Sequence, residues 1–153
     1  MSQLLARRQD APPWVLVVDD DPLAARGAAR LIMGSTGARV AIVGDVAQAL
    51  LLVTRADTAP SAVVLDYDLG GGEKGLAVLL SLRAAGVEVP CAFHTGGPAR
   101  ARAALRRSRL SDGYPVFDKG TTGDGELVEW LDSRLPGREK DSPHRSGIRE
   151  KLV

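Results

Sequence analysis

The sequence has few of the features that mark exported, membrane-spanning or nucleic-acid-coating proteins. Its 153 residues include one cysteine, Cys91, so a disulfide within the chain is excluded and a reduced, buried thiol is expected. No apolar stretch approaches the roughly 20 residues that cross a bilayer, and the N-terminus lacks the apolar core of an export signal. The formal net charge of +1 argues against a surface built for nucleic acid. We therefore expect a cytoplasmic protein that binds neither membrane nor nucleic acid directly.

The composition that is present fits one folded domain with flexible ends. Apolar residues make up 44% of the chain and charged residues 25%, which is enough for a substantial core. Residues 1–12 are largely polar and run into two prolines, so they predict a flexible leader. Residues 136–153 mix charges with few large apolar groups and predict a disordered tail. The ordered domain is expected to span residues 13–135.

Short apolar runs alternate with segments of helical periodicity along this domain. The most informative run is Ala62–Leu65, which is rich in β-branched side chains and is followed at once by Asp66. Such a run is typical of a strand buried on both faces of a parallel sheet. Pro115 restricts the last strand to a sheet edge, because proline cannot donate a ladder hydrogen bond. The other strands are expected at residues 14–18, 38–43, 87–95 and 113–118.

Helices are expected after each strand, and several carry start signals. Asp21 and Asp45 are predicted N-caps, and Pro22 suits the first turn that follows. Thr121, Thr122 and Asp124 offer caps for the last helix. Five strands that alternate with five helices predict an α/β fold, a doubly wound five-stranded parallel sheet of order 2-1-3-4-5.

This strand order brings acidic residues to one edge of the sheet. Asp19 and Asp20 follow the first strand and Asp66 follows the third, its neighbour. Taken alone, Asp66 could equally be a turn residue. Three carboxylates in one pocket repel one another, and at about 4 Å and an effective dielectric near 20 each pair costs on the order of 4 kcal/mol. Either one acid binds a proton or a hard cation lies among them, and we favour Mg²⁺ because all the ligands are oxygens.

A cation at this edge would also attract a phosphoryl group. The Thr95 hydroxyl and the Lys119 ammonium follow neighbouring strands and could bind the remaining phosphoryl oxygens. Asp66 would then be the nucleophile and become an aspartyl phosphate. His94, next to Thr95, should face the other side of the sheet as a hydrogen-bonded core or supporting histidine, not a catalytic one.

These strand ends carry motifs that resemble a known family. WVLVVDDDP, VVLDYD, Thr95 with the small Gly96, and Lys119 together resemble the receiver domain of two-component response regulators, over roughly Pro13 to Leu135. The resemblance implies a flavodoxin-like, CheY-like fold. It implies that Asp66 accepts phosphate from a histidine kinase or a phosphotransfer protein, with at most slow self-dephosphorylation and no enzymatic turnover.

The resemblance also assigns the site residues. Thr95, Gly96 and Lys119 would bind the phosphoryl group. Mg²⁺ would be held by Asp20, Asp66 and the backbone carbonyl of Asp68, with Asp19 acting mainly through water.

The switch region departs from the family pattern. The family's aromatic switch position holds Val116, with Phe117 beside it, so these two residues mark the candidate switch region. The family lysine is usually followed by a cis proline, whereas Gly120 follows Lys119. A cis bond without proline costs roughly 2.5 to 4 kcal/mol, so a trans bond is expected here.

The loop around the acceptor also departs from the pattern. Residues 70–72 are glycines where proline is common. Asp68 and Gly97 occupy positions that tune dephosphorylation in the family. We expect the glycine to leave the site open to water, which predicts a short-lived phosphoryl group.

Three functions compete on these features. The leading one is a stand-alone, single-domain response regulator that signals through a downstream protein. The second is a pseudo-receiver that binds protein without phosphorylation, and the third is a haloacid dehalogenase-type phosphatase, whose DxD strand end VVLDYD also resembles. A downstream protein could dock on the arginines of a predicted helix at residues 99–110, although a solvated charged helix is nearly as well supported; they are Arg100, Arg102, Arg106, Arg107 and Arg109.

Overall fold

The computed structural model of the chain describes residues 12–69 and 74–136. Three predicted segments therefore fall wholly or almost wholly outside the described residues: the leader at 1–12, the glycines at 70–72 and the tail at 136–153.

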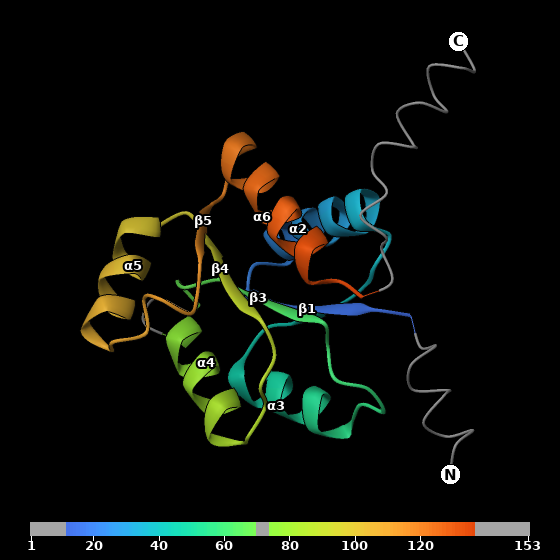
Figure 1. Cartoon of the computed structure of the whole chain (residues 1–153), viewed down its shortest axis with the longest axis horizontal. Helices are drawn as coiled ribbons and strands as arrows, with labels where there is room; N and C mark the ends of the chain where they lie inside the picture. The colour runs from blue at the N-terminus through green and yellow to red at the C-terminus, as the bar shows by residue number, and fades with distance from the viewer. Residues whose placement is uncertain (1–11, 70–73, 137–153) are drawn as a thin grey trace.

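Five parallel strands form one sheet in the order β2-β1-β3-β4-β5 (Figure 1). This arrangement confirms the predicted α/β fold and its 2-1-3-4-5 order, with the fifth strand at an edge. The strands are β1 (Trp14–Val18), β2 (Arg39–Val43), β3 (Ala62–Leu65), β4 (Cys91–Thr95) and β5 (Val116–Asp118).

Two strands begin later than the sequence predicts, and a proline precedes each of them. β4 was expected from Val87 and β5 from Gly113, but they begin after Pro90 and Pro115. Neither proline can donate to the ladder, although each carbonyl still accepts, at 2.8 Å from Val63 N to Pro90 O and 2.9 Å from Phe93 N to Pro115 O. The prolines therefore mark the strand starts.

The helices follow the predicted alternation, and two of the predicted caps are confirmed. Asp21 Oδ1 accepts from Leu23 N at 3.0 Å, and Asp45 Oδ1 accepts from Gln48 N at 2.7 Å. The last helix differs, because its N-cap is Gly120 and no side chain caps it. The helices are α2 (Pro22–Thr36), α3 (Val46–Arg55), α4 (Lys74–Ala84), α5 (Pro98–Arg107) and α6 (Thr121–Arg134).

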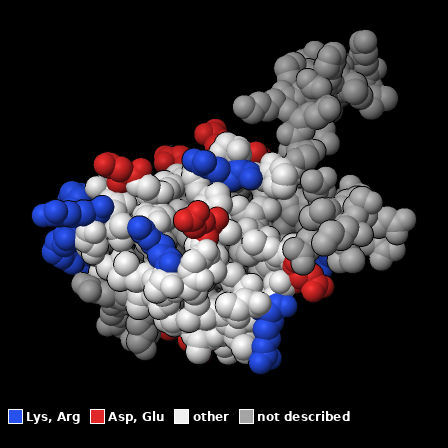
Figure 2. Space-filling view, turned by 60° about the horizontal axis from the view of Figure 1, so that its bottom comes forward, with Lys and Arg blue, Asp and Glu red and all other residues white. Residues whose placement is uncertain are grey.

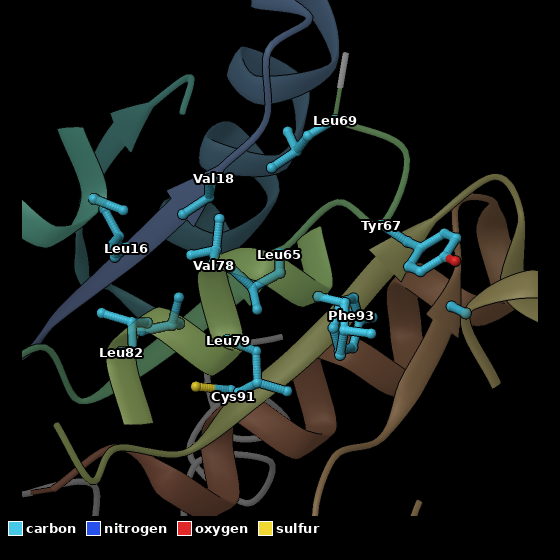
Figure 3. Packing of buried hydrophobic residues seen from close by; sticks show 14 of the residues in the cluster. Leu16, Val18, Leu65, Tyr67, Leu69, Val78, Leu79, Leu82, Cys91 and Phe93 are labelled. Atoms are coloured by element: carbon cyan, nitrogen blue, oxygen red, sulfur yellow. The ribbon is translucent and has the colours of Figure 1, made fainter. Parts of the chain in front are cut away.

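The helices cover the sheet in two layers, with α2 and α6 on one face and α3, α4 and α5 on the other (Figure 1). Alternate strand residues point to the two layers, so Leu65 and Phe93 pack with α4 while Val64 packs with α6. Figure 3 shows the larger cluster, in which the Tyr67 ring lies edge-on to Phe93 with centroids 6.3 Å apart. Burial on both faces holds the ends of β1 and β3 rigidly.

Cys91 lies in this core, as the sequence predicts. Its side chain is buried and its thiol donates to the carbonyl of Val89 at 3.3 Å. Burial raises the pKa of the Cys91 thiol to about 12, so it stays protonated at neutral pH and is not a nucleophile.

Candidate functional site

Strand register brings the three predicted acids together at the carboxyl edge of the sheet. Val18 lies opposite Leu65, and Asp66 N donates to Val18 O at 2.9 Å, so Asp19 and Asp66 leave the sheet side by side. Asp20 completes the group: one carboxylate oxygen from each acid lies within 4.8 Å of the others. Asp19 is buried, Asp66 is half-buried and Asp20 is exposed, so the group is open on one side.

Lys119 lies between two of these acids. Its Nζ is 3.0 Å from Asp19 Oδ2 and 3.1 Å from Asp66 Oδ2. Its backbone N–H donates to the carbonyl of Thr95 at 3.0 Å, which fixes the start of the Lys119 loop against β4. The structure thus brings Lys119 to the acidic strand ends, where it was predicted to bind a phosphoryl group.

Burial and charge act in opposite directions on this cluster. Burial raises the pKa of the Asp19 carboxyl above its ordinary value, although the Asp21 amide and the Lys119 ammonium oppose the change. Partial burial disfavours the charged form of Lys119, but its hydrogen bonds and attraction to Asp19 and Asp66 outweigh this and raise the pKa of its ammonium. Without a metal ion, the fold therefore disfavours the ionised form of the Asp19 carboxyl.

The donor set fits a hard divalent cation. Asp19, Asp20 and Asp66 supply only oxygen atoms, the ligands that hard divalent cations prefer. The group could hold a metal ion, and these residues would be its ligands. Asp66 Oδ1 accepts the Asp68 N–H at 3.2 Å, so the backbone after the strand is already folded back on the acceptor carboxylate.

The Thr95 hydroxyl is turned toward Asp68. Its Oγ1 donates to Asp68 Oδ2 at 3.3 Å and accepts the N–H of Gly97 at 3.1 Å. The other oxygen of Asp68, Oδ1, is 2.8 Å from Nη2 of Arg100. Thr95 is fully buried at the end of β4, and Gly96 is exposed directly after it.

Arg100 is the site residue that the sequence placed elsewhere. It was grouped with a docking face on the arginine helix, but it bends back from α5 to Asp68. It also occupies the space expected to be open beside Gly97, where an added Cβ would lie 2.6 Å from Arg100 Nη2. The spacing of the arginines gave no signal as to which one turns inward.

The candidate switch region brings no aromatic ring to Thr95. Val116 lies opposite Phe93 in the ladder, and its carbonyl accepts from Arg102 Nη2 at 3.1 Å. Phe117 points to the other face of the sheet, where its ring packs 6.2 Å from that of Trp130. The described residues contain no cis peptide bond, so the bond between Lys119 and Gly120 is trans, as expected.

His94 faces the opposite layer from Thr95, as the strand pattern predicts. Its Nε2 is 2.7 Å from Asp124 Oδ1, on the first turn of α6. The same oxygen accepts the N–H of Gly120 at 3.3 Å. Asp124 therefore ties β4 to the loop that carries Lys119, and His94 is a buried supporting residue.

Asp19→Asn is expected to stabilise the metal-free protein at neutral pH. The folded pKa of Asp19 is raised, so its contribution to stability is fully present below its ordinary value of 3.8 and is lost as pH rises through the raised pKa. Asparagine does not ionise and avoids this loss. The midpoint of thermal unfolding in EDTA should therefore lie above that of wild type at neutral pH.

The difference between Asp19→Asn and wild type should open as pH is raised from below 3.8. Asp57→Asn, which changes an exposed acid beyond α3, is the control and should show no such trend. A neutral-pH midpoint below that of wild type would contradict the interpretation of Asp19.

Comparison with known proteins places this geometry in a family. The family described as "Response regulator receiver domain" matches residues 15–109, a range that includes the acids and Thr95 and ends before Lys119. No curated protein matches the chain significantly. Among the described residues, no helix has both the length and the apolar character needed to cross a membrane.

Solved structures show the same fold. A response regulator receiver protein from Burkholderia phymatum is 26% identical, with a TM-score of 0.61 over 81% of this chain and 98% of that one. A CheY-like receiver domain protein from Methanospirillum hungatei JF-1 is 17% identical, with a TM-score of 0.65 over 86% and 100%. The receiver domain of the Francisella response regulator 1452 is 22% identical, with a TM-score of 0.60 over 80% and 98%.

Proposed function

Because the chain belongs to the response regulator receiver domain family, we propose that it accepts a phosphoryl group on Asp66 and signals by protein–protein contact. The observation that most supports this is the Lys119 ammonium shared between Asp19 and Asp66, at 3.0 and 3.1 Å. A lysine in this place lowers the cost of bringing an anion to an anionic pocket. Family membership, with the DYD strand third in the chain, favours a receiver over the phosphatase alternative.

The proposed reaction is transfer of a phosphoryl group to a carboxylate. An oxygen of Asp66 attacks phosphorus on a phosphohistidine of a kinase or phosphotransfer protein, the P–N bond breaks, and the leaving imidazole takes up a proton. Asp68 N–H holds Asp66 Oδ1, while Lys119 lies against Oδ2 and would pair with the incoming phosphoryl oxygens.

Mg²⁺ is the proposed cofactor. Asp19, Asp20 and Asp66, with the backbone carbonyl of Asp68, would hold it. When bound, Mg²⁺ supplies positive charge that offsets both the carboxylates and the phosphoryl oxygens.

We propose a cytoplasmic regulator without enzymatic turnover, whose downstream partner binds the charged face of α5. In Figure 2 one group of blue side chains lies at the left edge, the side on which α5 lies in Figure 1, and further blue side chains lie elsewhere on this face. Arg106, Arg107 and Arg109 are exposed at the end of α5 and just after it, so an acidic surface would complement this face. Arg100 and Arg102 are committed to Asp68 and to the Val116 carbonyl, and contribute less to it.

A pseudo-receiver is the second candidate, and the orientation of Phe117 favours it. With Val116 at the switch position and the Phe117 ring on the opposite face, no aromatic side chain of β5 is placed to follow Thr95. Such a protein would keep the acidic pocket and bind its partner without phosphorylation.

Labelling by a small phosphodonor separates the two candidates. Wild-type protein incubated with acetyl phosphate should be labelled when Mg²⁺ is present and not when EDTA replaces it. Asp66→Asn should abolish the label. Asp45→Asn is the matched control at the same sheet edge, because asparagine caps α3 as well as aspartate does, and it should be labelled like wild type. An unlabelled wild type that still binds Mg²⁺ would support the pseudo-receiver.

A further inference from the structure

We propose that Arg100 is a positioning residue that screens the charge of Asp68 at the Asp66 pocket, and thereby favours an anionic phosphodonor at the expense of Mg²⁺. The inference rests on the proposed phosphorylation of Asp66 and adds to the site a residue that the sequence assigned to a docking face. The test distinguishes failure of the Arg100 role from failure of Asp66 phosphorylation.

A chain of contacts links Arg100 to the pocket. Arg100 Nη2 is 2.8 Å from Asp68 Oδ1, and the second Asp68 oxygen accepts the Thr95 hydroxyl at 3.3 Å. The Thr95 oxygen in turn accepts the Gly97 amide at 3.1 Å. Arg100 therefore holds the carboxylate to which the Thr95 hydroxyl donates.

Gly97 makes room for this arrangement. An added Cβ there would lie 2.6 Å from Arg100 Nη2, 3.1 Å from Arg100 Nε and 3.0 Å from Asp68 Oδ2. Any larger residue at this position would push the guanidinium away from Asp68. The absence of a side chain at Gly97 thus leaves room for the ion pair.

The charge balance of the pocket gives Arg100 its effect. Asp19, Asp20 and Asp66 face the site and Asp68 adds a fourth acid, whereas Lys119 pairs with two of them. Without Arg100, the Asp68 charge would repel an incoming phosphoryl group and attract a cation. Both effects act within the Debye length of about 10 Å at 0.1 M salt, so they remain measurable in ordinary buffers.

Arg100 is not needed for the fold. Its side chain is 67% exposed and the pair lies at the surface, where such ion pairs contribute little to stability. Arg100→Gln should therefore stay folded, and its effects can be assigned to the pocket.

The test compares Arg100→Gln, Asp68→Asn and the control Arg106→Gln, an exposed arginine on the same helix. Mg²⁺ affinity is measured by calorimetry and labelling of Asp66 by its initial rate with acetyl phosphate. Arg100→Gln should tighten Mg²⁺ binding and slow labelling, each about two- to fivefold, the range of a surface ion pair. Asp68→Asn should do the reverse of both, and Arg106→Gln should change neither.

The amide signal of Gly97 provides a readout without any donor. Since this N–H binds the Thr95 oxygen, its chemical shift should move in metal-free Arg100→Gln and Asp68→Asn, and stay in place in Arg106→Gln.

The role of Arg100 would be overturned if Arg100→Gln raised both Mg²⁺ affinity and the labelling rate, or lowered both. It would also be overturned if Arg100→Gln changed them no more than Arg106→Gln does. Absence of label in every protein would instead refute the proposed function. The Mg²⁺ and Gly97 measurements would then still decide whether Arg100 screens Asp68.

Discussion

Gly123→Ala is expected to lower the free energy of unfolding by about 3 kcal/mol. Gly123 lies in the first turn of α6, directly over the end of β5, and an added Cβ would overlap the carbonyl oxygen of Asp118. The carbonyl carbon and the nitrogen of Asp118 would be 2.7 and 2.8 Å away. All three are backbone atoms, so α6 must move to relieve the overlap.

This movement should also reach the site, because Lys119 follows Asp118 directly. We expect a midpoint of thermal unfolding about 6–12 °C below wild type, together with slower labelling of Asp66. Gly125→Ala is the matched control in the same helix, where an added Cβ meets nothing within 4 Å. That change should stabilise the protein by about 0.5–1 kcal/mol, since alanine is the better helix former. Equal midpoints for the two variants would contradict this account of α6.

Lys119→Met is expected to slow the labelling of Asp66 about a hundredfold, the usual effect of removing one preorganised charge from a transition state. The ammonium touches both Asp19 and Asp66, and a methionine of similar length supplies no charge. Because Asp19 and Asp66 then lose the ammonium that contacts both, Mg²⁺ should bind more tightly. The variant therefore separates metal binding from phosphoryl transfer.

Labelling rates and Mg²⁺ calorimetry check this prediction side by side. Arg55→Met removes one positive charge from the last turn of α3, at the opposite edge of the sheet, and should leave both quantities unchanged. Labelling of Lys119→Met at the wild-type rate would remove lysine from the proposed mechanism.

The sheet and its acidic edge could be predicted because both depend on local pattern. Buried parallel strands appear as uninterrupted apolar runs, and each run in β1 and β3 ends in aspartate. Once the order of the strands is known, the pairing of β1 with β3 places Asp19 and Asp66 side by side at the sheet edge.

Contacts made by long side chains could not be predicted in this way. Asp68 and Arg100 are distant in sequence, and which arginine turns inward depends on how α5 is rotated against the sheet. The partner of His94 was equally hidden, because Asp124 was interpreted as a helix cap. The opposite orientations of Val116 and Phe117 could have been predicted, because neighbours on a strand point to opposite faces of the sheet. Only one of the two side chains can therefore share a layer with Thr95.

Peptide mapping of the phosphorylated protein tests the central claim most directly. Wild-type protein is treated with acetyl phosphate and Mg²⁺, the acyl phosphate is trapped by borohydride reduction, and the modified residue is identified by mass spectrometry. We expect reduction at Asp66 and no reduction at Asp19, Asp20 or Asp68. Without Mg²⁺, we expect no residue to be reduced. Modification at another residue, or an unmodified protein under conditions in which Mg²⁺ is bound, would contradict the central claim.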